Sequence, residues 1–344
     1  MMKADQEPHV WINEIRENDK ISGLYLVKEK RSGVTRKGDP FLTITLADRT
    51  GEVEAKVWDG VEAVSGLFRE GDVLEIAGHA GTFRNRIQLT LSHLRIAQEA
   101  GDPSLFIEST TGDVNEMMRS LRAVLKEIHQ GPMKTLVESF LADRPFLSLF
   151  KKAPAAKHFH HNYISGLLEH TLSVCRMGLA VSTHYRQLDR DLLLTGAFLH
   201  DIGKVRELKY DRQIDYTNEG RLLGHLILGV DMVEEKTGRL EDFPREQATL
   251  VKHLILSHHG QFEFGSPKRP KFLEAFALHL IDDLDAKING LGRFMEKDRQ
   301  EGVWTDFNRL FDRYFLKRKG FSQEEEKGDP DSLSEDRQGV LFSQ

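Results

Sequence analysis

Residues 198–204 read FLHDIGK, an apolar run that ends in a histidine, an aspartate and a lysine. Four other segments place histidine or aspartate in apolar sequence: GLLEHTLSV (166–174), GRLLGHLILG (220–229), ILSHHGQ (255–261) and HLIDDLDAK (279–287). Eleven of the 15 histidines lie between His158 and His279. Apolar residues recur at helical spacing throughout this region, which predicts an all-α domain with helices near residues 117–128, 133–141, 163–185, 191–200, 220–236, 245–257 and 273–289.

The N-terminal part has a different pattern. Segments rich in β-branched and aromatic residues, several of them alternating with period two, occupy residues 21–27, 41–46, 53–58, 73–76 and 87–94. Turn signals such as Gly38-Asp39-Pro40 separate them. Short strands within residues 12–97, without a long helix, predict a small closed β-barrel.

Composition places the chain among soluble proteins. It has 344 residues, of which 39% are hydrophobic and 30% charged, so we expect more than one domain. A single cysteine, Cys175, excludes an internal disulfide and a thiolate zinc site, and we expect it to pack in the core. The N-terminus lacks the apolar run of a signal peptide, and no segment has the roughly 18 apolar residues of a membrane span. These features predict a cytoplasmic protein without membrane attachment.

We divide the sequence into residues 1–97, a polar linker at 98–114, a helical domain at 115–320 and an acidic, disordered tail at 321–344. The aromatic residues of 307–319 predict an amphipathic helix that packs on the core or forms a subunit contact, which leaves a homo-oligomer open. The formal net charge is −6, but seven acidic and two basic residues between Glu324 and Arg337 account for −5 of it. Charge therefore does not argue against a nucleic-acid substrate.

The candidate ligands lie on or at the ends of predicted helices. Imidazole and carboxylate groups suit divalent transition metals, and ligands from facing helices are a usual way to build a metal site inside a bundle. A lone histidine on an apolar helix is more often an ordinary core residue. The informative feature is the ordered set, His, His-Asp, His, His-His and Asp.

That ordered set resembles the HD-domain metal-dependent phosphohydrolases. The resemblance implies that one metal is held by His170, His200, Asp201 and Asp282, and that a second, sharing Asp201, is held by His225, His258 and His259. Asp283 and Asp285 compete with Asp282, whose sequence context fits better. The ions would be one or two divalent metals, manganese first, with cobalt, iron, nickel and magnesium as alternatives.

Three nearby residues have two interpretations each. Lys204 could reach a phosphate oxygen of a substrate or face solvent. His161 could touch substrate phosphate if the chain folds back, or it could act as a structural cap. His279, one helical turn before Asp282, could orient that carboxylate or be an ordinary core or surface residue.

The N-terminal strands resemble an OB-fold of the nucleic-acid-binding kind. We expect a basic loop after the first strand to contact the nucleic acid with Lys28, Lys30, Arg31, Arg36 and Lys37, and a later turn to do so with Phe83, Arg84 and Arg86. Phe41 and Trp58 could stack on bases or fill the barrel interior.

The predicted fold is thus multidomain, an all-β OB-fold barrel followed by an all-α HD-domain bundle. This arrangement resembles the YhaM-type 3′-to-5′ exoribonucleases. The resemblance implies a metal-dependent enzyme that shortens single-stranded RNA, with single-stranded DNA as a second substrate class, and releases nucleoside 5′-monophosphates. Two alternatives stay open: an HD hydrolase of a small nucleotide or cyclic dinucleotide, and a non-catalytic nucleic-acid-binding protein.

Overall fold

A computed structural model describes residues 9–35, 37–84, 86–97, 102–298, 300 and 302–317. The predicted contact residue Arg36 and the predicted tail at 321–344 lie outside the described residues. The chain falls into two compact units, Met1–Asp283 and Leu284–Gln344. Within the described part, no helix is both long enough and apolar enough to cross a bilayer.

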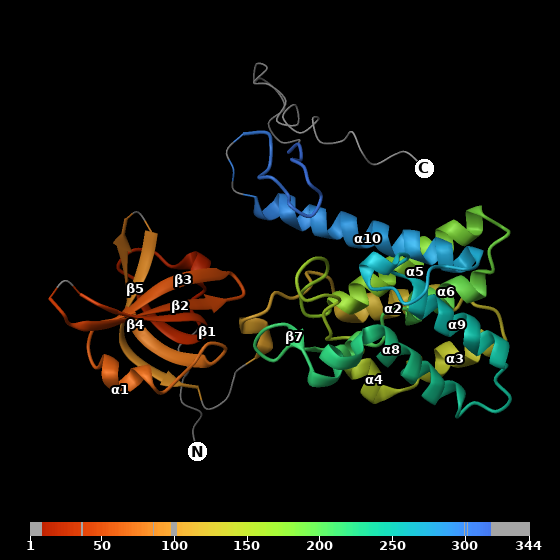
Figure 1. The fold of residues 1–344 in the computed structure, drawn as a ribbon, viewed down its shortest axis with the longest axis horizontal. Coiled ribbons are helices and arrows are strands. Elements are labelled where there is room, and N and C mark those ends of the chain that lie inside the picture. Colours follow the sequence, from red (N-terminus) through yellow and green to blue (C-terminus); the bar gives the residue numbers. More distant parts are fainter. Residues whose placement is uncertain are drawn as a thin grey trace. The chain divides into compact units, whose positions relative to one another are not determined.

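The first unit opens with a closed five-stranded barrel (Figure 1). After the short 3₁₀ helix η1 (Ile12–Glu14), the strands are β1 (Lys20–Val34), β2 (Pro40–Asp48), β3 (Gly51–Val57), β4 (Val73–Phe83) and β5 (Arg86–Ile96), with helix α1 (Val61–Ser65) between β3 and β4. The order around the barrel is β1-β2-β3-β5-β4, closed by antiparallel β1–β4 pairing, and β3 pairs with β5 in parallel. The predicted OB-fold barrel is confirmed.

Alternation along β2 shows why this sequence closes into a barrel. Leu42, Ile44 and Leu46 are fully buried in the interior, while the residues between them point outward. The largest side chain of the interior is Tyr25, which is also fully buried and donates its hydroxyl to the backbone oxygen of Val10 at 2.5 Å.

The predicted basic loop after the first strand is wrong over most of its length. Residues 28–34 continue β1 and pair with β2, with Gly33 opposite Phe41. The missing side chain of Gly33 makes room for Phe41, because a Cβ there would lie 2.6 Å from the Phe41 ring. Lys28, Lys30 and Arg31 are therefore strand residues.

The helical part follows η2 (Pro103–Leu105). Its elements are α2 (Val114–Leu125), α3 (Pro132–Leu141), α4 (Arg144–Phe150), α5 (Gly166–His184), α6 (Arg190–Leu199), α7 (Lys204–Glu207), the β6 (Leu208–Lys209) and β7 (Asp215–Tyr216) hairpin, α8 (Asn218–Thr237), α9 (Arg245–Ser257), η3 (Phe262–Phe264) and α10 (Leu273–Lys297). The side chains of Asp113, Asp143 and Asp189 accept backbone hydrogen bonds as N-caps of α2, α4 and α6. The predicted all-α HD bundle is confirmed.

Helices α5 and α6 pack against each other within the bundle. Eight of the ten residues of α6 are buried, and Cys175 of α5 is buried in the same core, as expected. Phe198 of α6 packs edge-on against Phe140 and Phe150. A helix that is buried on all sides holds the side chains at its C-terminal end in a fixed position.

The aromatic helix predicted for residues 307–319 is wrong as far as the described residues extend. Bridges join Trp304 to Leu316 and Asn308 to Arg313, so this segment doubles back on itself. The Asn308 side chain accepts from the backbone N–H groups of Leu310 and Phe311, which favours a turn over a helix.

Candidate metal centre

Helix α6 delivers His200 and Asp201 at its C-terminal end, and α5 delivers His170 from its first turns. The Nε2 atoms of His170 and His200 lie 3.1 Å apart. The Asp201 Oδ2 atom is 3.5 Å from the first and 3.4 Å from the second. Asp282 of α10 adds its Oδ1 at 3.1 Å from His170 Nε2 and 3.7 Å from His200 Nε2. The structure thus gathers the predicted first ligand set.

The other oxygen of Asp201 faces a second group of histidines. Asp201 Oδ1 is 3.6 Å from His225 Nε2 and 3.5 Å from His258 Nε2. His259 Nε2 lies 3.3 Å from His225 Nε2. One buried carboxylate therefore lies between two imidazole groups, one at each oxygen.

The imidazoles are held so that Nε2 points toward the centre. The Nδ1 atoms of His200, His258 and His259 contact the backbone oxygens of Ala197 (3.0 Å), Ile255 (2.8 Å) and Phe264 (3.0 Å). A carbonyl oxygen can only accept, so in each ring Nδ1 carries a proton and donates, and Nε2 is the nitrogen that faces the centre. Such outward hydrogen bonds fix the tautomer of metal-binding histidines.

The residues present fit divalent cations. Within the described residues, Asp201 Oδ1 is buried without a hydrogen-bond partner, although imidazole nitrogens surround it. The Nε2 atoms of His170 and His200 lie 3.1 Å apart and those of His225 and His259 3.3 Å apart, so each pair offers two lone pairs to one cation when both rings are bound through Nε2. These separations suit ligands bonded to one ion at about 2.0–2.2 Å. Groups with this geometry include His170 with His200 and Asp201, and His225 with His258 and His259.

The charges of the centre also favour cation binding. Burial opposes ionisation of Asp201, but the Lys204 ammonium and His200 outweigh it and hold the pKa of Asp201 well below its usual range. Burial likewise opposes ionisation of Asp282, while the hydrogen bond from His170 lowers its pKa. Burial, with His258 and His225 nearby, lowers the pKa of His259 to about 3. At neutral pH, Asp201 and Asp282 are carboxylates and His259 is a neutral imidazole.

Lys204 does not face solvent. It is 8% exposed, and its Nζ donates to Asp201 Oδ2 at 2.5 Å. The interpretation of this lysine as a solvent-facing residue is therefore wrong, and its ammonium lies at the centre.

His161 is also buried, with its ring centroid 5.4 Å from that of His170 and its Nδ1 2.8 Å from the Tyr163 hydroxyl. The ligand atoms of His161 and His170 lie within 4.8 Å of each other, so His161 lies beside the centre. The chain does fold back before α5, because Gly166 lacks the Cβ that would lie 2.0 Å from the His161 backbone oxygen.

Two residues beside the centre were missed from the sequence. Glu207 accepts from both the backbone N–H and the Nδ1 of His225, at 3.0 and 3.1 Å. Burial opposes its ionisation, but the hydrogen bond from His225 leaves the Glu207 pKa below its usual range. His160 packs its ring 5.5 Å from that of His170, and burial lowers its pKa to about 3. Neither residue belongs to an apolar periodic pattern. The only signals in the sequence were that Glu207 closely follows the FLHDIGK segment and that His160 lies in a histidine-rich segment.

Two glycines make this geometry possible. A Cβ at Gly203 would lie 2.0 Å from the His225 backbone oxygen, so the turn after Asp201 and the α8 backbone come too close for any side chain. Gly224 has φ of +73° and kinks α8 immediately before His225.

His279 does not contact Asp282 through its Nδ1, which instead hydrogen-bonds the backbone oxygen of His258 at 2.9 Å.

The predicted nucleic-acid contacts on the barrel differ in their surroundings, because some of these side chains already have protein partners and others are exposed. Lys30 donates to the backbone oxygens of Ser65 and Phe68, so its ammonium holds the end of α1. Arg31 pairs with Glu29 at 2.7 Å. Phe83 is 56% exposed beside Arg84, whose guanidinium lies 5.3 Å from the ring centroid. Exposed side chains also include Lys28, Lys37 and Arg86.

Phe41 and Trp58 do not fill the barrel interior. Trp58 is 46% exposed, and the two ring centroids lie 5.3 Å apart, with the Lys56 ammonium 5.1 Å from the Phe41 ring. Phe41 is on β2, Lys56 is on β3 and Trp58 directly follows β3. An aromatic pair beside a cation at this place is typical of OB-fold surfaces that bind single-stranded nucleic acid.

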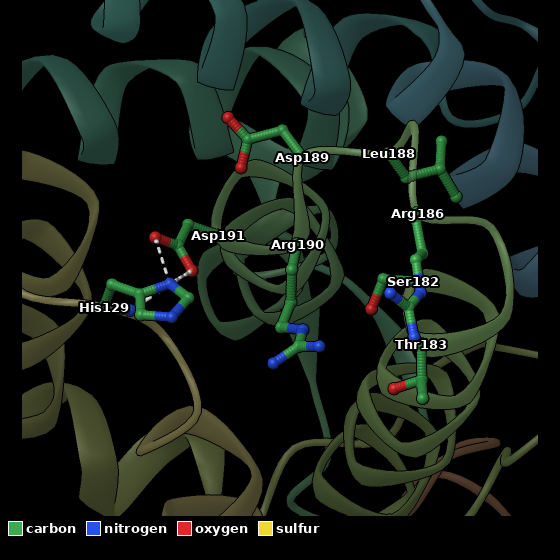
Figure 2. Close-up of a pocket in the computed structure, with 8 residues that line it drawn as sticks. All are labelled: His129, Ser182, Thr183, Arg186, Leu188, Asp189, Arg190 and Asp191. Atoms are coloured by element: carbon green, nitrogen blue, oxygen red, sulfur yellow. Dashed lines mark hydrogen bonds and ion pairs between the residues drawn. The ribbon is translucent and has the colours of Figure 1, made fainter.

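A pocket of about 490 Å³ lies at the other ends of α5 and α6. Figure 2 shows Arg186 and Arg190 beside it, with His129 hydrogen-bonded to Asp191 at 3.0 Å. Ser182 is 12 positions after His170 on α5, about 18 Å along a helix. This pocket is therefore separate from the histidine centre.

Comparison with known proteins agrees with a barrel domain followed by a helical domain. An OB-fold nucleic acid binding domain matches residues 11–97, and an HD domain matches residues 167–287. Proteins named 3′-5′ exoribonuclease YhaM from Bacillus velezensis and Bacillus subtilis are each 35% identical over 299 residues, covering 85% of this chain and 94% of theirs. The protein of that name from Oceanobacillus iheyensis is 35% identical and is covered to 91%.

Solved structures resemble the N-terminal part. The second OB-fold domain of replication protein A from Methanococcus maripaludis is 16% identical, with a TM-score of 0.22, and covers 27% of this chain and 97% of its own. The mitochondrial single-stranded DNA binding protein Rim1 from Saccharomyces cerevisiae is 12% identical, with a TM-score of 0.21, and covers 24% and 97%.

Proposed function

Because the chain belongs to the YhaM family of 3′-5′ exoribonucleases, we propose that it is a metal-dependent hydrolase that removes nucleotides from the 3′ end of single-stranded RNA. The observation that carries this proposal is the position of Asp201 between two imidazole groups. Such a centre suits phosphodiester hydrolysis, since bound divalent cations activate water and stabilise the oxygen that leaves.

The residues then have separate tasks. We assign one ion to His170, His200, Asp201 and Asp282, and a second to His225, His258 and His259 with the other oxygen of Asp201. Lys204, buried beside Asp201, supplies positive charge for the phosphoryl oxygens, whose charge grows during the reaction. We assign His161, whose ring centroid lies 5.4 Å from that of His170, to contact the phosphate of the last linkage.

The reaction has a defined balance. Water adds to phosphorus at the last linkage, the 3′-oxygen of the penultimate nucleotide leaves and takes up a proton, and a nucleoside 5′-monophosphate is released. Manganese is the first choice of metal, with cobalt, iron, nickel and magnesium as alternatives that share the preference for imidazole or carboxylate ligands.

We assign strand binding to the barrel at residues 1–97, which the segment at 98–114 joins to the hydrolytic part at 115–320. Candidate contacts on the barrel are Lys28, Arg31, Lys37, Phe83, Arg84 and Arg86. Lys30 is left out, because its ammonium already binds backbone oxygens. Holding a long strand on the barrel raises the local concentration of its end at the centre.

The test uses RNA labelled at either end, with the metal removed by chelation and each candidate ion added back. With manganese, 5′-labelled RNA should shorten stepwise and 3′-labelled RNA should release labelled mononucleotide at once. Asp201→Ala should abolish both while circular dichroism stays native, and exposed Asp231→Ala is the matched control. Hydrolysis of mononucleotides or cyclic dinucleotides alone would favour the small-molecule alternative, and full activity of Asp201→Ala would contradict the metal assignment.

A further inference from the structure

The segment after the His258-His259 pair has an unusual surface composition. Residues 261–271, which we call the QFEF loop, read QFEFGSPKRPK. Phe262 is 58% exposed and Phe264 65% exposed, whereas a phenylalanine is normally among the most buried residues. The loop also exposes Lys268, Arg269 and Lys271, with Glu263 as its one acidic residue. Exposed aromatic rings among positive charges are typical of single-strand binding surfaces.

The QFEF loop is fixed rather than loosely attached. The Phe264 backbone oxygen is 3.0 Å from His259 Nδ1, so one imidazole ring separates the loop from the candidate metal centre. The buried Ser266 hydroxyl lies 2.9 Å from the backbone oxygen of Leu256, and the Lys271 N–H donates to His253 Nε2 at 3.1 Å. Helix α9 therefore sets the position of both phenylalanines.

Two glycines shape the turn that presents the rings. Gly260 has φ of +79° and Gly265 has φ of +81°, which favour glycine over other residues. A Cβ at Gly260 would also lie 2.2 Å from the His279 ring. Close packing there keeps the start of the loop against the buried part of the bundle.

The charge of the loop lies next to its rings. The Arg269 guanidinium carbon is 5.3 Å from the centroid of the Phe262 ring, a cation–π distance. A nucleotide offers a flat base and an anionic phosphate, which these two groups can bind together. An apolar protein partner would gain nothing from the three basic residues.

We propose that the QFEF loop is a binding site for the 3′-terminal nucleotides of single-stranded RNA, with Phe262 and Phe264 stacking on bases and Lys268 and Arg269 contacting phosphates. This inference rests on the proposed exonuclease function and adds the residues that hold the strand end at the centre. The barrel would bind the strand at a distance from its end, and the loop would position its last linkage.

The test measures binding without catalysis. Single-stranded RNA carrying 2-aminopurine at the 3′-terminal or at a mid-strand position is titrated with the full chain in chelator, and its fluorescence and anisotropy are recorded. Stacking should quench the terminal probe most. The double variant Phe262→Ala/Phe264→Ala should lose that quenching and bind about tenfold more weakly, since each stacked base contributes strongly to affinity. Phe276→Ala, which removes an equally exposed ring (57%) from α10, is the matched control and should behave as the wild type.

A second variant separates charge from stacking. Lys268→Ala/Arg269→Ala should keep the quenching of the terminal probe at low salt. Its affinity should depend less steeply on salt: the magnitude of the slope of log affinity against log salt should decrease by about 0.7 for each phosphate that is no longer neutralised. Unchanged quenching in the Phe262/Phe264 variant would overturn the proposal, as would equal losses in the Phe276 control. A change in oligomeric state without a change in RNA binding would assign the rings to a protein contact instead. If the wild type binds as expected but does not hydrolyse RNA, the proposed function fails while this site stands.

Discussion

Lys204 donates to Asp201 Oδ2 across 2.5 Å, and both side chains are almost completely buried. The ammonium thus supplies a positive charge at the same carboxylate that is positioned to hold cations. Breaking a buried ion pair by removing one partner typically costs about 3–5 kcal/mol, because the other charge is left uncompensated. The stability of the metal-free protein should therefore depend on this lysine.

We predict that Lys204→Met lowers the melting temperature in chelator and that manganese then raises it by more than in the wild type, because the cation replaces the missing charge. Differential scanning calorimetry with chelator and with manganese measures both effects. Lys252→Met is the control, since its partner Glu234 is largely exposed and surface pairs contribute about 0–1 kcal/mol. Equal metal-induced shifts in wild type and Lys204→Met would mean that Asp201 holds no cation.

Glu207 gives a second prediction, about metal affinity. Its carboxylate accepts from His225 Nδ1 and so fixes the ring with Nε2 toward the centre. Glu207→Gln keeps the shape of the side chain but removes the negative charge that makes the His225 imidazole a stronger ligand for a metal. Loss of such a hydrogen-bonding partner behind a metal ligand typically lowers metal affinity by about 10–100-fold. Isothermal titration with manganese should show that loss for one ion. Glu219→Gln, at the surface pair with Arg206, should leave the affinity unchanged.

The sequence predicted the centre because rare polar residues stood in fixed order within strongly apolar helices. The predicted ligands all have ligand atoms turned toward one another: His170, His200, Asp201, His225, His258, His259 and Asp282. Glu207 and His160 could not be found in this way. Their contacts depend on the short α7 helix and on an irregular segment before α5, where no periodicity marks which side chains meet.

The errors have equally local causes. Residues 28–34 have the charged composition of a loop, but pairing with β2 along the strand outweighs that composition. Residues 307–317 have aromatic side chains at helical spacing, but the Asn308 side chain binds the next backbone N–H groups and turns the chain. In both segments, a contact made at one or two positions overrides the average preference of the sequence.

Gly203 gives a third prediction, about the turn that carries the ligands. A Cβ there would lie 2.0 Å from the His225 backbone oxygen and 2.7 Å from the Gly229 nitrogen, and backbone cannot move aside as a side chain can. Gly203→Ala should lower the free energy of unfolding by about 2–4 kcal/mol. Urea denaturation measures the change. Gly81→Ala, where a Cβ would meet nothing within 4 Å, should cost less than about 1 kcal/mol, and similar losses in both variants would contradict the close approach.

Asp215 gives the last prediction, about acid stability. The hydrogen bond from Lys157, at 2.8 Å, is the largest cause of a pKa lowered to about 2, with Arg221 also contributing. Because the pKa in the folded protein lies below the usual aspartate value of 3.8, the stabilisation is present above about pH 4 and is lost as the pH falls toward 2.

Asp215→Asn should therefore lower the free energy of unfolding at pH 7 by about 1–2 kcal/mol, the smaller figure allowing for solvent screening of a partly exposed pair. The difference from wild type should shrink between pH 4 and pH 2, where the native carboxyl also becomes neutral. Denaturant titrations at pH 7, 4 and 2.5 measure this, with exposed Asp59→Asn as the matched control. A deficit that stayed constant down to pH 2.5 would mean that the Asn side chain perturbs packing and that the charge of Asp215 is not what stabilises the hairpin.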